Sequence, residues 1–325
     1  MKIARLLIAS ATLTAMVTTS AFALEPEDIF KRAAPAVWTV KADVGNNQVG
    51  IGSAVAISPN LLVTACHVVT KAITVKLTQQ QREAKVIRIT RDPVPEHDLC
   101  VLHTEPGVVL TPVAIAPINT IQVGAKAYAI GSPHGLELTL SEGLVSSLRA
   151  NATSNLPTIQ TSASISAGSS GGGLFDAEAR LMGVTINISP GGENLGFAYP
   201  AQLVMELPKR IDAELVLWRE RLKNLGVVIG ANGEPTPSGH ADLANEAALP
   251  VLGQGSDPAA LRLAYKQFLL QSQPRAFMIT GDGRFGTVTS LAGLNEQLAD
   301  CAMKKVTCAV YALNDTVVWL SLIHI

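Results

Sequence analysis

The sequence carries little charge, and the charge that it carries is balanced. Charged residues make up 16% of the 325 residues, with 25 Lys and Arg against 26 Asp and Glu, a formal net charge of −1. A chain without an excess of basic residues has no electrostatic footprint for a nucleic acid. Because 48% of the residues are hydrophobic, the composition is that of a packed globular protein and excludes disorder.

The first residues lack an apolar run long enough to span a membrane. The stretch 6–17 has about a dozen apolar or small residues, whereas a spanning helix needs about 20. It follows the basic residues Lys2 and Arg5 and precedes Ala21-Phe22-Ala23, the small-x-small form of a cleavage site. We expect residues 1–23 to be a signal peptide for export to a bacterial periplasm or beyond, leaving no stable membrane span once it is removed. An uncleaved anchor is the alternative.

Cysteine is scarce, with four residues in the chain. Export would permit disulfides, and the cysteines fall into two pairs by region, Cys66 with Cys100 and Cys301 with Cys308. For Cys66 and Cys100, two buried free thiols are the alternative.

One glycine-rich stretch stands out, Gly168-Ser169-Ser170-Gly171-Gly172. Glycines allow backbone torsions that a Cβ forbids, so they can expose the Ser170 hydroxyl on a tight bend. Bent backbone also lets neighbouring N–H groups point at one spot, as an oxyanion hole requires. A flexible Gly/Ser linker would have a similar composition.

A serine hydroxyl needs a base, and the base needs an orienting carboxylate. His67 lies two residues after the run 61–65, which is apolar apart from Thr64, and Asp98 directly precedes the apolar run 99–102. The chain order His67, Asp98, Ser170 is that of the chymotrypsin group among the three known orders. If His67 and Asp98 touch, their neighbours Cys66 and Cys100 lie close, and a disulfide there would hold the base next to its carboxylate. His97 is expected to be a solvated neighbour of Asp98.

Five elements of the chain together resemble the trypsin-like serine peptidases, and within them the bacterial Deg/HtrA branch. Thr64-Ala65-Cys66-His67-Val68-Val69 is similar to the T-A-x-H-V-V element of that branch. The others are Asp98 to Leu102, Ala129 to Leu136 with Ser141 to Ser146, Gly168 to Gly172, and Leu195 to Pro200. They stand in the family's order and cover roughly residues 27–205, about three fifths of the chain.

The resemblance implies an exported serine endopeptidase that acts through an acyl-enzyme on peptide or unfolded protein substrates, without a metal or organic cofactor. Ser170 would be the nucleophile, His67 the base and Asp98 its orienting carboxylate, with the N–H groups of Gly168 and Ser170 as oxyanion hole. Ser164, six residues before the nucleophile, would lie at the floor of the specificity pocket. Because Ser164 carries no charge, we expect small or medium apolar residues before the cut. Trimers are usual in this branch, so an oligomer is possible.

Two departures from the family pattern concern the loop around Ser170. Ser169 stands where Asn or Asp is usual, and Gly173 stands where Pro is usual. Both would loosen the oxyanion loop. The alternative function is therefore a resting or catalytically weak scaffold, a chaperone-like protein-binding module regulated through its C-terminal domain. His134, on a loop, is a further candidate for lining the cleft.

The pattern of short apolar runs separated by turn residues predicts an all-β barrel or sandwich. The resemblance implies an all-β two-barrel trypsin-like peptidase domain, which we place at residues 24–225. A helix is expected over residues 25–34, and residues 110–123 are expected to cross between the barrels. The expected strands are residues 35–40, 49–57, 61–65, 73–77, 84–89, 99–102, 126–130, 138–148, 158–162, 174–175, 181–188 and 195–199.

The remaining chain has a different character. Apolar residues at three- and four-residue steps over 201–225 predict an amphipathic helix, broken or restarted at Pro208. Residues 226–249 are expected to be a linker, and 250–320 a small α+β domain of unknown function without the features of a PDZ module. In that domain the expected helices are residues 257–270 and 291–303, and the expected strands are residues 276–280, 285–288, 308–313 and 316–319. The last five residues, 321–325, are apolar and lack a closing feature, and we expect them to be a truncated or non-native tail.

Overall fold

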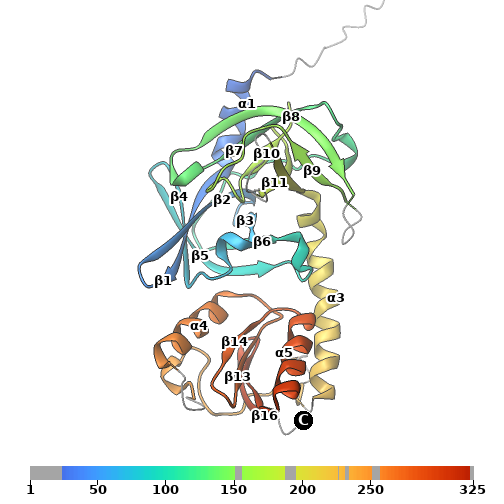
Figure 1. The fold of residues 1–325 in the computed structure, drawn as a ribbon. Coiled ribbons are helices and arrows are strands. Elements are labelled where there is room, and N and C mark those ends of the chain that lie inside the picture. Colours follow the sequence, from blue (N-terminus) through green and yellow to red (C-terminus); the bar gives the residue numbers. More distant parts are fainter. Residues whose placement is uncertain are drawn as a thin grey trace, which may run out of the picture.

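Two closed six-stranded antiparallel barrels and a four-stranded sheet make up the computed structural model (Figure 1). It describes residues 24–150, 156–186, 195–225, 227–230, 234–250 and 257–322. The expected all-β two-barrel domain with a small α+β unit is confirmed. The predicted signal peptide, residues 1–23, lies outside the described residues. Within the described part, no helix is long and apolar enough to cross a membrane.

The first barrel follows helix α1 (Pro26–Ala33), which the sequence predicted. Its strand order is β1-β2-β3-β6-β5-β4. Buried and exposed residues alternate along β4, so the barrel interior receives Val75 and Leu77. The hairpin between β1 and β2 turns where Gly45, Asn46 and Asn47 all have positive φ. The strands are β1 (Val37–Gly45), β2 (Gln48–Ser58), β3 (Leu61–Ala65), β4 (Thr74–Gln79), β5 (Arg82–Arg91) and β6 (Leu99–Thr104).

The second barrel has the strand order β10-β11-β12-β9-β8-β7. All six residues of β11 are buried, which explains why Thr185 is its one polar side chain. The segment between the barrels contains no strand and joins the second barrel through a bridge from Ile115 to Leu181. The strands are β7 (Lys126–Gly131), β8 (Thr139–Arg149), β9 (Thr158–Thr161), β10 (Gly173–Phe175), β11 (Leu181–Ile186) and β12 (Gly196–Pro200).

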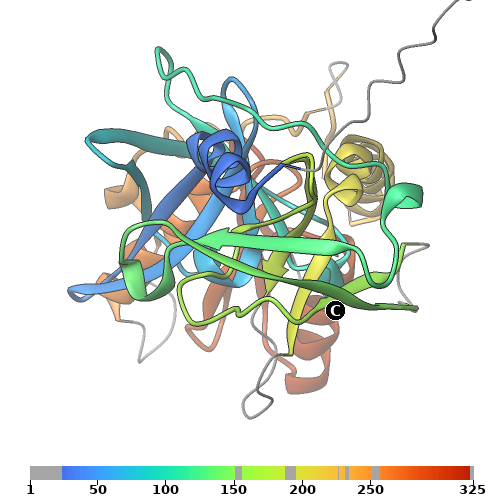
Figure 2. The same cartoon turned by 90° about the horizontal axis from the view of Figure 1, so that it is seen from above.

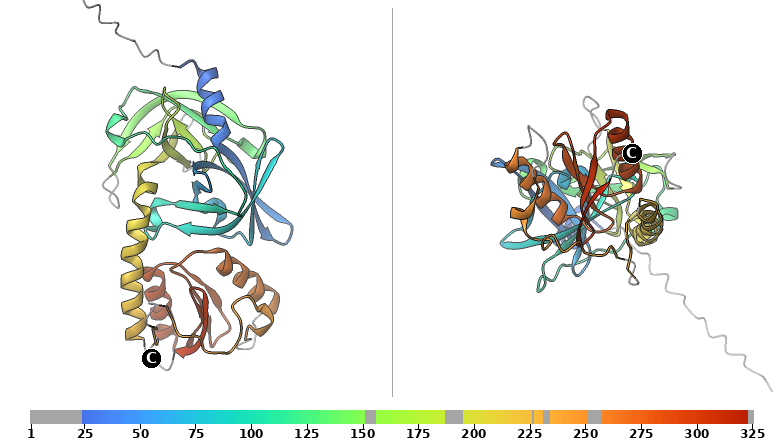
Figure 3. Two further views of the ribbon diagram at one scale, coloured as in Figure 1. Left: turned by 180° about the vertical axis from the view of Figure 1, so that it is seen from behind. Right: turned by 90° about the horizontal axis from the view of Figure 1, so that it is seen from below.

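Helix α3 (Gln202–Asn224) runs from the barrels to the C-terminal unit, as the view from behind in Figure 3 shows. In Figure 2 it is seen nearly end-on beside the barrels. The prediction of a break at Pro208 was wrong, because the helix continues through this residue. Proline removes one backbone N–H from the helix. The Arg210 side chain, two residues beyond Pro208, donates to the Leu203 carbonyl at 2.8 Å, and Leu207 is buried against the barrels.

The C-terminal unit is a sheet of order β14-β13-β15-β16 with two helices. Asp257 and Ser290 accept backbone N–H bonds as N-caps of α4 and α5. Ser321 and Leu322 pair with β15 in strand β16. The elements are α4 (Pro258–Leu270), β13 (Ala276–Thr280), β14 (Phe285–Val288), α5 (Leu291–Lys304), β15 (Cys308–Leu313) and β16 (Thr316–Leu322).

The C-terminal unit contacts the first barrel at strand β5. The Ser272 backbone N–H donates to the Ile89 carbonyl at 2.8 Å, and Gln271 forms a parallel bridge with Ile89. The Gln267 amide donates to the Lys71 carbonyl at 2.9 Å. Together with α3, these bonds attach the unit to the barrels at two places.

Candidate active site

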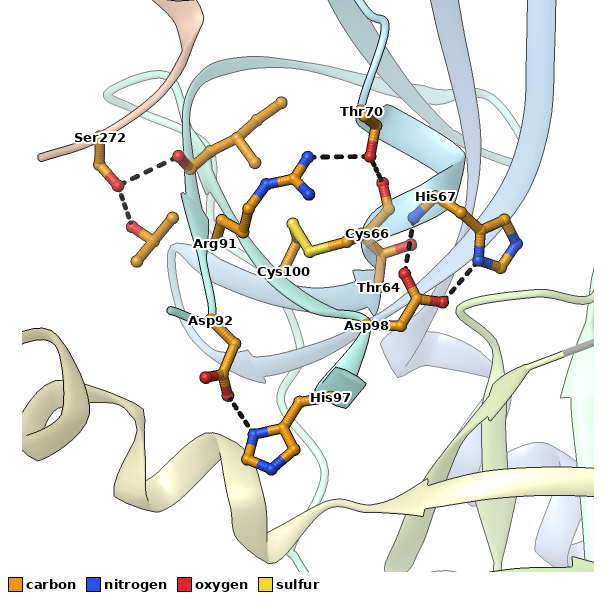
Figure 4. The surroundings of a disulfide bond; sticks show 12 residues. Thr64, Cys66, His67, Thr70, Arg91, Asp92, His97, Asp98, Cys100 and Ser272 are labelled. Carbon is orange, nitrogen blue, oxygen red and sulfur yellow. Dashed lines mark hydrogen bonds and ion pairs between the residues drawn. A yellow bond between two sulfur atoms is a disulfide. The ribbon is translucent and has the colours of Figure 1, made fainter. Parts of the chain in front are cut away.

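His67 and Asp98 lie together on the first barrel (Figure 4). Strand β3 ends at Ala65, and the short helix α2 (Cys66–Val69) that follows carries His67. The His67 ring Nδ1 lies 2.6 Å from Asp98 Oδ2, and the His67 backbone N–H donates to Oδ1 at 2.8 Å. Both oxygens of the carboxylate are therefore used to orient one histidine.

The backbone around this pair is held at two further points. The Cys66 N–H donates to the Asp98 carbonyl at 2.8 Å. A disulfide joins Cys66 to Cys100, whose Cα atoms are 4.8 Å apart, and a second disulfide joins Cys301 to Cys308 in the C-terminal unit. Asp98 itself has φ +43°, a left-handed conformation that an Asp adopts more readily than most residues. Because of these constraints, the carboxylate is held facing His67.

Ser170 lies on the loop between β9 and β10 of the second barrel and is 5% exposed. Gly168 and Gly171 on either side have φ +91° and +85°, values that glycine adopts without strain. The N–H groups of Gly168 and Ser170 donate to no acceptor in the described part of the protein, whereas the Ser169 N–H donates to Ser166 at 2.9 Å. Two backbone donors near the serine hydroxyl are thus available to an oxyanion.

Ser53, on β2 of the first barrel, holds the loop of the second barrel in place. Its N–H donates to the Ser170 carbonyl at 2.8 Å, and its hydroxyl donates to the Gly168 carbonyl at 2.9 Å. The Thr64 hydroxyl in turn donates to the Ser53 carbonyl at 2.7 Å. Ser53 was not predicted from the sequence; the signal that marks it is a polar residue in the interior of an apolar strand.

The two barrels bring the serine loop next to the segment that carries His67. A Cβ added at Gly52 would meet the Val68 side chain at 2.4 Å and the Ser170 carbonyl oxygen at 3.2 Å. Val68 follows His67 directly, so the serine loop and the histidine helix flank the same glycine. Among the described residues no hydrogen bond joins the Ser170 hydroxyl to the His67 ring.

Asp98 governs the electrostatics of the histidine. Hydrogen bonding and charge from Asp98 raise the pKa of His67 above its ordinary value, although burial acts in the opposite direction. Arg91 lies behind the pair and donates to the Thr70 hydroxyl at 2.8 Å. Burial lowers the pKa of Arg91, and the negative charge of Asp98 partly offsets this effect.

Ser164 lines a pocket of about 280 Å³ beside the serine loop. Its backbone N–H donates to the Ser141 hydroxyl at 2.8 Å. The described residues that line this pocket are uncharged, and six of them carry hydroxyl groups. These six are Thr139, Ser141, Ser164, Ser166, Ser169 and Thr185; the others are Ala129, Ile130, Gly131, Pro133 and Leu140.

The two other histidines considered in the sequence, His134 and His97, differ in their exposure to solvent. His134 is exposed and has φ +51°, and its backbone N–H donates to the Ala167 carbonyl at 2.8 Å, next to Gly168. The prediction that His97 is solvated was wrong, since it is 2% exposed. The His97 ring bonds the Asp92 carboxylate at 3.0 Å, and Arg210 of helix α3 donates to the same carboxylate. His97 therefore lies under α3 rather than in solvent. Within the described ranges, no group of three or more His, Cys, Asp and Glu side chains could hold a metal ion.

These features define the class of the protein. Residues 52–184 match the family of trypsin-like peptidase domains. The chain therefore contains a trypsin-like serine peptidase domain, with His67 and Asp98 on one barrel and Ser170 on the other. Relatives named as periplasmic serine proteases and the solved structure of an HtrA-type protease place this domain in the Deg/HtrA branch.

Two relatives show the extent of this likeness. The chain is 36% identical over 173 residues to a probable periplasmic serine protease do/HhoA-like of Haemophilus influenzae, covering 50% of this chain and 36% of that protein. It is 34% identical over 174 residues to the periplasmic pH-dependent serine endoprotease DegQ of Escherichia coli, covering 50% of this chain and 37% of that protein. The chain thus spans little more than a third of the length of these relatives.

Solved structures agree with this placement. The HtrA-type protease AlgW with tripeptide is 30% identical with a TM-score of 0.50, covering 58% of this chain and 64% of the other. A serine endoprotease from Yersinia pestis is 28% identical with a TM-score of 0.51, covering 57% and 66% of the two chains.

Proposed function

We propose that this protein is an exported serine endopeptidase that cleaves peptide bonds through an acyl-enzyme. The observation that carries the proposal is the pair of hydrogen bonds from His67 to Asp98, together with a serine loop whose Gly168 and Ser170 N–H groups have no acceptor among the described residues. Such a constellation serves acyl transfer, because it supplies a base, its orienting carboxylate, a nucleophile and an oxyanion site. The relatives named above as periplasmic support export.

The geometry supports the following roles. The Ser170 hydroxyl attacks the carbonyl carbon of the substrate while His67 Nε2 takes its proton. Asp98 accepts from the Nδ1–H of His67, which fixes the tautomer and stabilises the imidazolium that forms. The N–H groups of Gly168 and Ser170 stabilise the oxyanion. His67 then gives its proton to the leaving amine, and water releases the acyl group by the same steps in reverse.

Labelling with a fluorophosphonate probe tests the proposal. The probe phosphonylates serines that an adjacent base has activated. We expect stoichiometric labelling of the mature protein at Ser170 and none in Ser170→Ala, read by intact mass and peptide mapping. The Ser169→Ala variant is a matched control, because it removes the neighbouring hydroxyl while Ser170 is retained. Labelling that persists in Ser170→Ala would contradict the assignment.

A second candidate function is a resting scaffold that binds proteins under the control of the C-terminal unit. Two observations favour it. The Ser170 hydroxyl has no hydrogen bond to the His67 ring in the part of the chain that the structure describes. The C-terminal unit bonds β5 at Ile89, and Arg91 two residues on pairs across the sheet with Cys100. A folded protein that is not labelled by the probe would support this function over the first.

The hydroxyl-lined pocket around Ser164 predicts the substrate residue before the cut. With a volume of about 280 Å³ and uncharged walls, it suits small and medium uncharged side chains. Ser164→Asp is expected to raise kcat/KM for substrates with Arg or Lys at this position at least about tenfold, because a carboxylate at the floor pairs with the cation. Digestion of a peptide library measures the preference, and Ser164→Asn serves as the uncharged control. A wild-type preference for Arg or Lys would refute the assignment of this pocket.

A further inference from the structure

Hydrogen bonds between residues close in sequence hold the segment 92–97, directly before Asp98, in a compact turn. The Asp92 N–H donates to the Leu99 carbonyl at 3.0 Å, so the bonds span the whole segment and Asp98. Inside it, the Val94 N–H donates to Asp92 Oδ1 at 3.1 Å and the His97 N–H donates to the Val94 carbonyl at 3.1 Å. Asp98 therefore lies within a stretch of chain that is hydrogen-bonded at both ends.

A buried carboxylate and a buried imidazole hold this segment together. The Asp92 and His97 side chains are 1% and 3% exposed, and His97 Nδ1 donates to Asp92 Oδ2 at 3.0 Å. His97 Nε2 has no hydrogen-bond partner among the described residues. Among the described residues, Asp92 is therefore the one hydrogen-bond partner of the ring. A carboxylate this deeply buried needs a cationic partner.

That partner comes from α3, which is remote in sequence. Arg210 Nε donates to Asp92 Oδ1 at 3.1 Å, and Arg210 Nη2 bonds Oδ2 and also the Leu203 carbonyl. The planar guanidinium thus binds both oxygens of the carboxylate, a geometry that lysine cannot reproduce. In Figure 4 the adjacent residues His97 and Asp98 point to opposite sides, His97 toward Asp92 and α3, and Asp98 toward His67.

We propose that Arg210 is a positioning residue for Asp98, acting through the buried Asp92 carboxylate and the His97 ring. This role rests on the proposed function. By binding both oxygens of Asp92, Arg210 keeps the carboxylate directed at His97 and the segment 92–97 closed. Asp98, the next residue, then keeps its left-handed backbone and both of its bonds to His67. Arg210 touches none of the reacting groups.

Arg210→Gln tests the role, with Arg219→Gln as matched control. Arg219 lies on the same helix, and its ion-pair partner is Glu234 in the C-terminal part of the chain. We expect Arg210→Gln to lower the maximal rate of phosphonylation by a fluorophosphonate about 10- to 100-fold, because a misplaced catalytic group costs this much. The half-saturating probe concentration should stay within about twofold, because the pocket lies on the other barrel. Arg219→Gln should change neither quantity.

An NMR titration of the His67 imidazole provides a readout that needs no turnover. Loss of the Asp98 contact should lower the pKa of His67 in folded Arg210→Gln and leave it unchanged in Arg219→Gln. A wild-type rate and an unchanged His67 titration in folded Arg210→Gln would overturn the positioning role. A lowered His67 pKa in a protein that the probe never labels would support the role and overturn the proposed function.

Arg210→Lys decides the matter if Arg210→Gln does not fold. Lysine keeps a positive charge beside Asp92 but cannot bind both oxygens in one plane. We expect this variant to fold and to lose about tenfold in the rate of phosphonylation, with a smaller fall in the His67 pKa than in Asp98→Asn. Wild-type values of both quantities would show that Arg210 only neutralises Asp92, and would overturn the proposal.

Discussion

Replacing Asp98 with asparagine is expected to lower kcat by about 10⁴, or about 5.5 kcal/mol of transition-state stabilisation. The carboxylate accepts from both the Nδ1 and the backbone N–H of His67, so it sets the tautomer and the position of the ring at once. An asparagine amide in its place can present an N–H to Nδ1. The ring would then carry its proton on Nε2, where it cannot accept the proton of Ser170.

The same variant should change the pH dependence. His67 acts as a base only when neutral, so activity rises with pH through its pKa. Asp98 raises the pKa of His67, which places this rise at a higher pH than an isolated histidine would. In Asp98→Asn the hydrogen bond to a carboxylate and the charge are lost while burial remains, so the rise should move to lower pH.

Steady-state kinetics from about pH 5 to 9 on a peptide substrate would measure both effects. Asp212→Asn, which neutralises an exposed carboxylate on α3, is the control and should behave as wild type. A folded Asp98→Asn protein with a loss of less than about tenfold would rule out the assigned role of Asp98.

Gly171→Ala is expected to lower kcat/KM by about 10²–10³ and to destabilise the protein. A Cβ at this position would meet the Ser53 carbonyl oxygen at 2.1 Å and the Thr64 hydroxyl at 2.3 Å. These atoms belong to the first barrel and form the chain of bonds that holds Ser170. The loop or the barrel must therefore shift, and the N–H groups around Ser170 shift with it.

Gly107→Ala separates this contact from backbone strain. Gly107 has φ +90°, close to the +85° of Gly171, but a Cβ there would meet nothing within 4 Å. Both variants carry the cost of an alanine at positive φ, about 1 kcal/mol, whereas Gly171→Ala alone carries the steric contact. Thermal unfolding and peptide kinetics on both proteins are the measurements. Equal activity of the two variants would show that the contact with Ser53 has no part in placing the serine.

How much of this could be predicted from the sequence depends on how local each signal is. Strands such as β4 and β11 were predictable because the alternation of apolar and polar residues, or a run of mainly apolar residues, can be recognised from neighbouring positions in the sequence. His67, Asp98 and Ser170 were candidates because each lies in a short pattern, a strand end or a glycine-rich bend. The error at Pro208 arose because a local rule for proline was applied where Arg210 and packing against the barrels stabilise the helix.

His97 and Ser53 show the other limit. The sequence predicted a solvated His97, because nothing near it in the chain reveals that Arg210 will cover Asp92 from 118 residues away. Ser53 bonds a glycine 115 residues later, and such pairings depend on how two barrels meet.

The sequence by itself determined the short strands, the small C-terminal unit and the residue types that can carry acyl-transfer chemistry, because these depend on periodicity, turn residues and short motifs. The pairing of the strands into two barrels was implied by the family resemblance. Only the tertiary structure decided which groups hold those residues in place. The hydrogen bonds of Ser53 to the serine loop and the Arg210 contact with Asp92 join different elements. Such bonds form only after the hydrophobic cores have brought the elements together, so no local pattern records them.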